Sequence, residues 1–143
     1  RSIPFNDFYV VLGTALEQGE IITEVQVPKP KAGTTQTYTK LGMRQAIDWA
    51  LVSVASAITV EGGTVTDARI TLGGVAPIPY RATAAENAIK GKAISAALAT
   101  TAGSAAVADA IPMTNNAYKV QMARILVKRA ILGQPSLGEQ APA

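Results

Sequence analysis

The pattern of apolar and polar residues divides the chain into a strand-rich first part and a helix-rich second part. Short runs rich in Thr, Tyr, Val and Ile predict strands at residues 21–27, 34–41, 51–60 and 64–72. Glu61, Gly62 and Gly63 join the last two runs. Because glycine adopts positive φ without steric cost, these three residues predict a tight hairpin turn.

The second part of the chain is rich in alanine and has apolar residues at helical spacing. It predicts three helices, at residues 83–90, 95–111 and 116–132. Thr83 and Glu86 have the spacing of a capping box, and Gly91 and Gly133 end the first and third helices. The expected apolar faces are Ala97, Leu98, Thr101, Ala105 and Ala108 on the second helix, and Val120, Ala123, Ile125, Leu126, Val127 and Ile131 on the third. Strands followed by helices predict an α+β fold, a small antiparallel sheet of three to four strands packed against three C-terminal α-helices.

Two prolines and a glycine separate the first predicted strand from the others. Pro28 and Pro30 favour an extended backbone and cannot donate a ladder hydrogen bond, and Gly33 follows closely. We therefore expect a domain boundary near residue 30, a compact unit at residues 31–133 and a flexible tail at residues 134–143.

Composition excludes several classes of function. The 143 residues are 48% hydrophobic and 16% charged, which is typical of a globular domain with one core. The net charge of +3 comes from scattered basic residues, so the basic stripe of a nucleic-acid binder is missing. With no Cys and no His, the chain offers no thiolate zinc site, no iron–sulfur ligands and no imidazole for proton transfer.

No segment of the sequence is predicted to cross a membrane. The longest apolar stretch, residues 49–60, is interrupted by hydroxyl residues and is too short to span a bilayer. The chain begins at Arg1 rather than Met, and residues 1–12 lack the layout of a signal peptide, so we expect the natural start to lie upstream. We expect a cytoplasmic protein, with the periplasm as the alternative, since the absence of Cys does not separate the two.

A polar set formed by Tyr38, Lys40, Arg44 and Asp48 is the candidate for chemistry. It ends one predicted strand and leads into the next. Read from composition alone, it is a loop with solvated charges and one weak surface ion pair. Neither a G-x-G-x-x-G nor a G-x-x-x-x-G-K-[ST] motif occurs, and the carboxylates are dispersed, so the sequence does not predict a self-contained active site.

The motifs of the chain follow a recognisable order. They are Arg1-x-Ile3-Pro4-x-x-Asp7-Phe8-Tyr9, then Leu16-x-x-Gly19-Glu20-Ile21-Ile22-x-x-Val25-x-Val27-Pro28, then Tyr38-x-Lys40-x-x-x-Arg44-x-x-x-Asp48, then Thr66-Asp67-Ala68-Arg69-Ile70, and then Leu72-Gly73-Gly74-Val75-Ala76-Pro77-x-Pro79-Tyr80-Arg81-Ala82. This series resembles the FAD-binding (medium) subunit of molybdenum hydroxylases of the xanthine dehydrogenase and carbon monoxide dehydrogenase type. The resemblance extends from residue 1 to about residue 133.

The resemblance implies a division of the chain and a set of partners. Residues 1–30 would be the tail of the middle, PCMH-type FAD-binding domain, and residues 31–133 the C-terminal domain of the CO dehydrogenase flavoprotein. The partners would be an iron–sulfur subunit with two 2Fe–2S clusters and a subunit that carries the molybdenum cofactor. Electrons taken from substrate at molybdenum would pass through the clusters to FAD, and then to NAD or another acceptor.

The resemblance also implies two cofactor-binding residues. Ile22 falls where the family has an apolar contact to the flavin, and Lys40 falls where some members have a lysine near the flavin ring. A cation there would stabilise the negatively charged reduced ring and raise its potential, and an aliphatic side chain would exclude water. Arg44 and Asp48 would hold a loop between domains.

The FAD phosphates are bound in this family by glycine-rich segments of the N-terminal half, and the sequence does not contain them. We therefore expect the chain by itself to be inactive and to show no flavin absorbance after purification. A purely structural role, in which the domain docks the subunit onto its iron–sulfur and molybdenum partners, is the alternative. A helix-rich partner-binding module without a flavin is a third. The substrate stays open, since its pocket lies on another subunit in this family.

Overall fold

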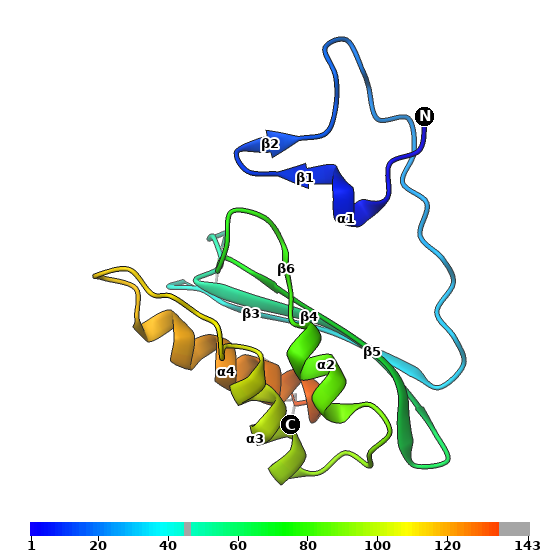
Figure 1. Cartoon of the computed structure of the whole chain (residues 1–143), viewed down its shortest axis with the longest axis vertical. Coiled ribbons are helices and arrows are strands. Elements are labelled where there is room, and N and C mark those ends of the chain that lie inside the picture. The colour runs from blue at the N-terminus through cyan, green and yellow to red at the C-terminus, as the bar shows by residue number, and fades with distance from the viewer. Residues whose placement is uncertain (45–46, 135–143) are drawn as a thin grey trace.

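The computed structural model describes residues 1–44 and 47–134, and its central element is a four-stranded antiparallel sheet. The strands lie in chain order and are β3 (Thr34–Leu41), β4 (Val52–Glu61), β5 (Thr64–Gly73) and β6 (Tyr80–Arg81). One face of the sheet is covered by α2 (Thr83–Ile89), α3 (Ala96–Ala105) and α4 (Tyr118–Ile131), as Figure 1 shows. The predicted α+β fold is therefore confirmed.

The three long strands form where the sequence predicts them. β3 pairs with β4 from Thr34 opposite Thr59 to Leu41 opposite Val52, and β4 continues into β5 through a tight hairpin. Gly62 and Gly63 in this turn have φ of +55° and +79°. Positive φ at both central residues is the turn geometry that matches the twist of a hairpin, so the glycine pair has the predicted role. The two-residue strand β6 is too short to leave a pattern in the sequence.

Alternation along β4 and β5 builds the core. Alternate side chains of these strands point to the helices, and apart from Ser56 the buried ones are apolar. A register shift at Thr59/Val60 interrupts the alternation once, so Val65 and Ala68 are three residues apart. The sheet contributes Val52, Val54, Ile58, Val65, Ala68, Ile70 and Leu72, and the helices contribute Ala85, Ile89, Ala99, Ala102, Ala123, Leu126, Val127 and Ile131. Each large side chain of this kind stabilises the fold by about 1.5–3 kcal/mol relative to an exposed one.

Helix α4 agrees with the prediction to within two residues at each end. Ala123, Leu126 and Val127 of the predicted stripe are buried, whereas Ile125 is 38% exposed. Gly133 follows the helix with a φ of +64°, so it ends the helix in the predicted way.

Helix α3 differs from its prediction in length and in its buried face. Ser95 caps it as expected, accepting a hydrogen bond from the Leu98 N–H at 3.2 Å, but the helix ends at Ala105 rather than near residue 111. Its buried residues are Ala99, Ala102 and Gly103. Leu98 of the predicted face packs against the core, and the rest of that face is wrong. The physical reason is that Ala, Thr, Ser and Gly differ little in hydrophobicity, so the sequence of this helix carries almost no periodic signal.

The capping box predicted at Thr83 is also wrong. The residue before helix α2 is Ala82, and no side chain caps the helix. The carboxylate of Glu86 instead accepts the backbone N–H of Ile70 on β5 at 2.9 Å and two hydrogen bonds from the Arg81 guanidinium at 2.9 and 3.0 Å. Glu86 thus joins helix to sheet. Gly91, with a φ of +74°, does end the helix.

The N-terminal segment lies on the side of the sheet opposite the helices (Figure 1). It contains the short helix α1 (Phe5–Phe8) and the strands β1 (Tyr9–Val10) and β2 (Gly13–Thr14). The two strands pair with each other and form a sheet separate from the four-stranded one. The strand predicted at residues 21–27 does not form. Its apolar side chains Ile21, Ile22, Val25 and Val27 are exposed, and the described residues offer them no neighbouring strand to share backbone hydrogen bonds.

Of the flexible tail predicted at residues 134–143, Gln134 is described, and residues 135–143 lie outside the described residues. Among the helices of the described chain, none has the length and apolar character needed to cross a membrane.

Candidate functional site

Lys40 lies near the end of β3, on the sheet face that the helices leave open. Thr39 is buried on the helix side beside Val54, so the alternation of a strand puts Lys40 on the opposite face. Its register partner on β4 is Ser53, which in turn pairs with Gly73 on β5. A Cβ added at Gly73 would lie only 2.5 Å from the Ser53 Oγ. Across the strands, Lys40 therefore has small side chains beside it, whereas along β3 its neighbour on the same face is the large, exposed Tyr38.

The loop between β3 and β4 is organised by the carboxylate of Asp48. Its Oδ2 accepts the backbone N–H groups of Met43 at 3.0 Å and Arg44 at 3.1 Å, and its Oδ1 accepts the N–H of Trp49 at 2.9 Å. The Arg44 guanidinium lies 3.7 Å from Oδ1. Arg44 and Asp48 thus hold a loop, and this loop connects two neighbouring strands of one sheet.

The backbone of the same aspartate reaches Lys40. The Lys40 Nζ donates a hydrogen bond to the carbonyl oxygen of Asp48 at 3.2 Å. Within residues 1–44 and 47–134, this is the one hydrogen bond of the ammonium, which has three N–H donors. The carbonyl places no opposite charge beside the ammonium, which has donors left for a ligand on the open face.

Ile22, the other predicted site residue, lies in the extended part of the N-terminal segment. Its side chain is 52% exposed, and it belongs to no helix or strand. No hydrogen bond among the described residues ties residues 21–23 to the sheet. That Ile22 and Lys40 contact the same flavin stays a prediction.

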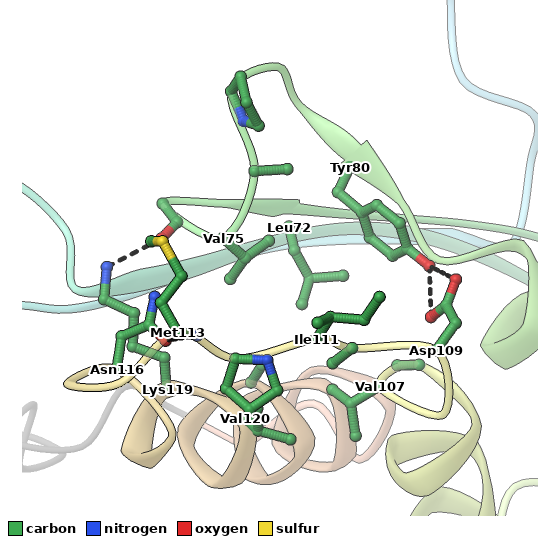
Figure 2. Close-up of a pocket in the computed structure, with 17 residues that line it drawn as sticks. Leu72, Val75, Tyr80, Val107, Asp109, Ile111, Met113, Asn116, Lys119 and Val120 are labelled. Carbon is green, nitrogen blue, oxygen red and sulfur yellow. Dashed lines mark hydrogen bonds between the residues drawn. The ribbon is translucent and has the colours of Figure 1, made fainter.

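A groove of about 510 Å³, which the sequence does not predict, lies on the helix side of the sheet, at the same end of the strands as Lys40. Figure 2 shows its walls, which are the segment after β5 and the segment between α3 and α4, with Leu72 and Val120 between them. Two side-chain contacts join the walls. At one end the Tyr80 hydroxyl donates to the Asp109 carboxylate at 3.0 Å, and at the other the Lys119 Nζ donates to the Gly74 carbonyl at 3.1 Å.

The electrostatics of the groove follow from these contacts. Partial burial, followed by the hydrogen bond to Asp109 and its negative charge, raises the pKa of Tyr80, so the phenol stays neutral at physiological pH. Sequence reasoning missed Asp109 because the second helix was predicted to continue to residue 111, whereas α3 ends four residues before Asp109. Pro112 marks a helix boundary only near residue 111, so it does not indicate the earlier end of α3.

The described residues fit one side of a flavin site rather than a whole one. Lys40 supplies a cation with free donors, and the exposed ring of Tyr38 lies two residues earlier on the same face of β3. The glycines with positive φ lie in separate turns, so the described chain builds no glycine-rich cradle for phosphates. Nor do the described residues contain a group of three His, Cys, Asp or Glu side chains that could hold a metal ion.

Comparison with known proteins gives relatives that include medium chains and an FAD-binding subunit of dehydrogenases and oxidoreductases. The carbon monoxide dehydrogenase medium chain of Hydrogenophaga pseudoflava is 35% identical over 136 residues, which cover 92% of this chain and 47% of the relative. The aldehyde oxidoreductase FAD-binding subunit of Escherichia coli is 41% identical over 92 residues, or 60% of this chain and 27% of the relative. The chain thus spans about half or less of the length of these relatives.

The solved structures agree. A structure of carbon monoxide dehydrogenase from H. pseudoflava that lacks the Mo-pyranopterin moiety of the molybdenum cofactor matches with a TM-score of 0.85 and 38% identity, over 92% of this chain and 47% of that one. The CO dehydrogenase flavoprotein C-terminal domain family matches residues 37–134. The chain belongs to this family, and the resemblance drawn from its motifs is confirmed. The matched residues include Lys40, Asp48 and the groove.

Proposed function

We propose that this chain forms part of the FAD-binding subunit of a molybdenum hydroxylase and that Lys40 is its contribution to the flavin site. The observation that carries this proposal is the position of the Lys40 ammonium, held by a neutral carbonyl on the open face of the sheet. A flavin, when bound, accepts and passes on electrons. A fixed cation beside it favours the reduced, more negative form.

The proposal extends to the organisation of the chain. Residues 1–30 belong to the tail of the preceding FAD-binding domain, and residues 31–133 form the C-terminal domain. The exposed apolar side chains of the first segment support this division, since they need a cover that the second does not give them. Ile22 is the apolar residue of this segment that we assign to the flavin.

The wider assembly follows from the family. The names of the relatives support a complex that has an FAD-binding subunit and a molybdenum cofactor. In the proposed complex, a molybdenum-cofactor subunit and an iron–sulfur subunit deliver electrons to FAD, and NAD or another acceptor receives them. The phosphates of FAD are bound by other parts of the subunit. We propose the cytoplasm as the compartment.

The substitution Lys40→Met in the complete flavin-loaded enzyme tests the role of this lysine. Loss of the cation is expected to lower the midpoint potential of the flavin, by an electrostatic interaction of about 1–4 kcal/mol for a charge within a few ångströms. The matched control is Lys92→Met, because Lys92 also donates to a backbone carbonyl, that of Ala88 at 2.9 Å, but lies after helix α2. Potentiometric titration with the flavin absorbance as the signal measures both variants.

A docking role is the second candidate, and the exposed apolar side chains favour it. Trp49 is 92% exposed, Ile111 is 93% exposed and Met113 is 73% exposed, which suits a surface covered by another subunit. The same experiment separates the two candidates. If the Lys40→Met enzyme has an unchanged flavin potential and assembles less well, Lys40 has no role in the flavin site, and docking is the function of the domain.

A further inference from the structure

Asp48 performs two tasks with two different groups. Its carboxylate is saturated by three backbone N–H groups, those of Met43, Arg44 and Trp49, and its side chain is only 16% exposed. Its main-chain carbonyl accepts the hydrogen bond of Lys40. Because both groups belong to one residue, whatever fixes the carboxylate also fixes the carbonyl.

We propose that Asp48 is a positioning residue that sets the place of the Lys40 ammonium on the open face of the sheet. The inference rests on the proposed function of Lys40 in the flavin site and deepens it. Asp48 itself does not touch the flavin in this proposal. It acts through the loop that its carboxylate closes and through the carbonyl that the closed loop presents.

A lysine needs such a device. Its side chain has four rotatable bonds and a strongly hydrated ammonium, so at an exposed position it samples many rotamers. A direct carboxylate partner would fix the ammonium but would also cancel its charge. Here the carboxylate is occupied by backbone donors, and the ammonium receives a neutral acceptor. The arrangement therefore holds the cation and preserves its charge.

The surroundings of the loop keep this geometry. The Leu51 N–H donates to the Leu41 carbonyl at 2.8 Å and closes the base of the loop. A Cβ added at Gly42 would lie 3.4 to 3.6 Å from the Arg44 carbonyl, the Trp49 carbonyl and the Asp48 Oδ2. The loop is thus packed around Gly42, and the Asp48 carboxylate is part of that packing.

The sign of the effect separates positioning from simple electrostatics. Removing a negative charge near a flavin makes reduction easier and raises its potential. Releasing the lysine removes a well-placed positive charge and lowers the potential. The proposal therefore expects Asp48→Ala to lower the flavin potential, in the same direction as Lys40→Met and by a smaller shift.

The first test is a double-mutant cycle in the complete flavin-loaded enzyme, with the flavin potential as the readout. Asp48→Ala is expected to lower the potential when Lys40 is present and to cause no further drop in the Lys40→Met background. Asp67→Ala is the matched control, because Asp67 also accepts a backbone N–H and pairs with a lysine, Lys90, but lies at the other end of the sheet. A rise in potential, no change, or an equal drop in both backgrounds would overturn the proposal.

The second test does not depend on the flavin. The rate at which an amine-specific reagent modifies Lys40, followed by mass spectrometry of the same enzyme, should rise about two- to fivefold in Asp48→Ala, which corresponds to the loss of one exposed charge-assisted contact. Lys92 should be modified at an unchanged rate.

If Lys40→Met leaves the flavin potential unchanged, the proposed flavin role of Lys40 is wrong, and the modification rate still decides whether Asp48 positions Lys40. An unchanged rate at Lys40 would disprove positioning. If the Asp48→Ala enzyme does not assemble, Asp48→Asn, which keeps one acceptor oxygen, serves in both tests with a smaller expected effect.

Discussion

Two regions of the molecule contain similar apolar residues and treat them in opposite ways. In residues 34–134, outside the loops that carry Trp49, Ile111 and Met113, they lie along β4 and β5 and meet three helices. The result is a core in which Val54, Ile70 and Leu126 have no exposed surface. In residues 1–33 they remain open, with Leu12 98% exposed and Ile21 84% exposed. The difference does not lie in the residues themselves. It lies in the presence or absence of a second surface.

In the N-terminal segment, polar contacts do not compensate for the missing burial of apolar side chains. The Arg1 guanidinium donates twice to the Glu20 carboxylate, at 2.7 Å in each case, and once to the Ala15 carbonyl at 2.9 Å. The hydrogen bond from Arg1, together with the backbone N–H of Glu17, lowers the pKa of Glu20 to about 2. These groups are at the surface, where ion pairs contribute little to stability. They shape the segment locally and do not attach it to the sheet.

The largest expected effect tests the packed region at Glu86. Glu86→Ala removes the acceptor of the buried Ile70 N–H and the partner of Arg81, so it should lower the free energy of unfolding by about 3 kcal/mol. Urea unfolding of the chain, followed by circular dichroism, measures this loss. The control is Glu86→Gln, which keeps an acceptor oxygen and should cost less. Equal costs for both variants would mean that the negative charge paired with Arg81, which both variants remove, rather than the acceptor for the Ile70 N–H, makes this residue necessary.

A smaller effect tests the contact between α3 and α4 at Gly103. In an isolated helix, Gly→Ala is stabilising by about 1 kcal/mol. Here a Cβ at position 103 would lie 2.5 Å from the carbonyl oxygen of Arg124, so the helices must separate. Gly103→Ala should therefore destabilise the chain by about 2 kcal/mol. Ser104→Ala, at the exposed neighbouring position, should stay within about 0.5 kcal/mol of the original chain. Stabilisation by Gly103→Ala would show that the helices can move apart without cost.

The sequence predicts those parts of the fold whose cause is local. The Gly62 and Gly63 turn, the strands on either side of it, the Ser95 cap and the end of α4 at Gly133 follow from the backbone preferences of a few adjacent residues. The bond between Glu86 and the Ile70 N–H joins residues far apart in the chain, and local spacing instead suggested a capping box. The strand expected at residues 21–27 failed for a related reason, because a strand requires a partner that the pattern does not supply.

The candidate site, like the fold, has one part that the sequence predicts and another part that it does not. Lys40 comes from the resemblance of its motif, and composition alone would leave it as a solvated charge. The dual role of Asp48 became visible only in three dimensions, because its carboxylate bonds to residues on both sides of the loop. The groove depends on contacts between Tyr80 and Asp109 and between Lys119 and Gly74, which no spacing in the sequence indicates.

The smallest expected effect is the most direct test of the contrast between the two regions. If residues 1–30 do not stabilise the sheet, their removal should leave the free energy of unfolding of the remainder unchanged within about 0.5 kcal/mol. The variant should begin at Lys31, because the Lys31 carbonyl accepts from Thr34 at 3.2 Å and the Gly33 carbonyl accepts from Val60 at 3.1 Å. A second variant that begins at Thr35 loses both of these hydrogen bonds and the one between the Thr34 and Thr59 hydroxyls, and it should be less stable by about 1 kcal/mol for each. Urea unfolding of the three chains side by side gives the comparison. A large loss on removing residues 1–30 alone would mean that the exposed segment does contribute to the fold of the sheet, and the boundary proposed near residue 30 would have to be withdrawn.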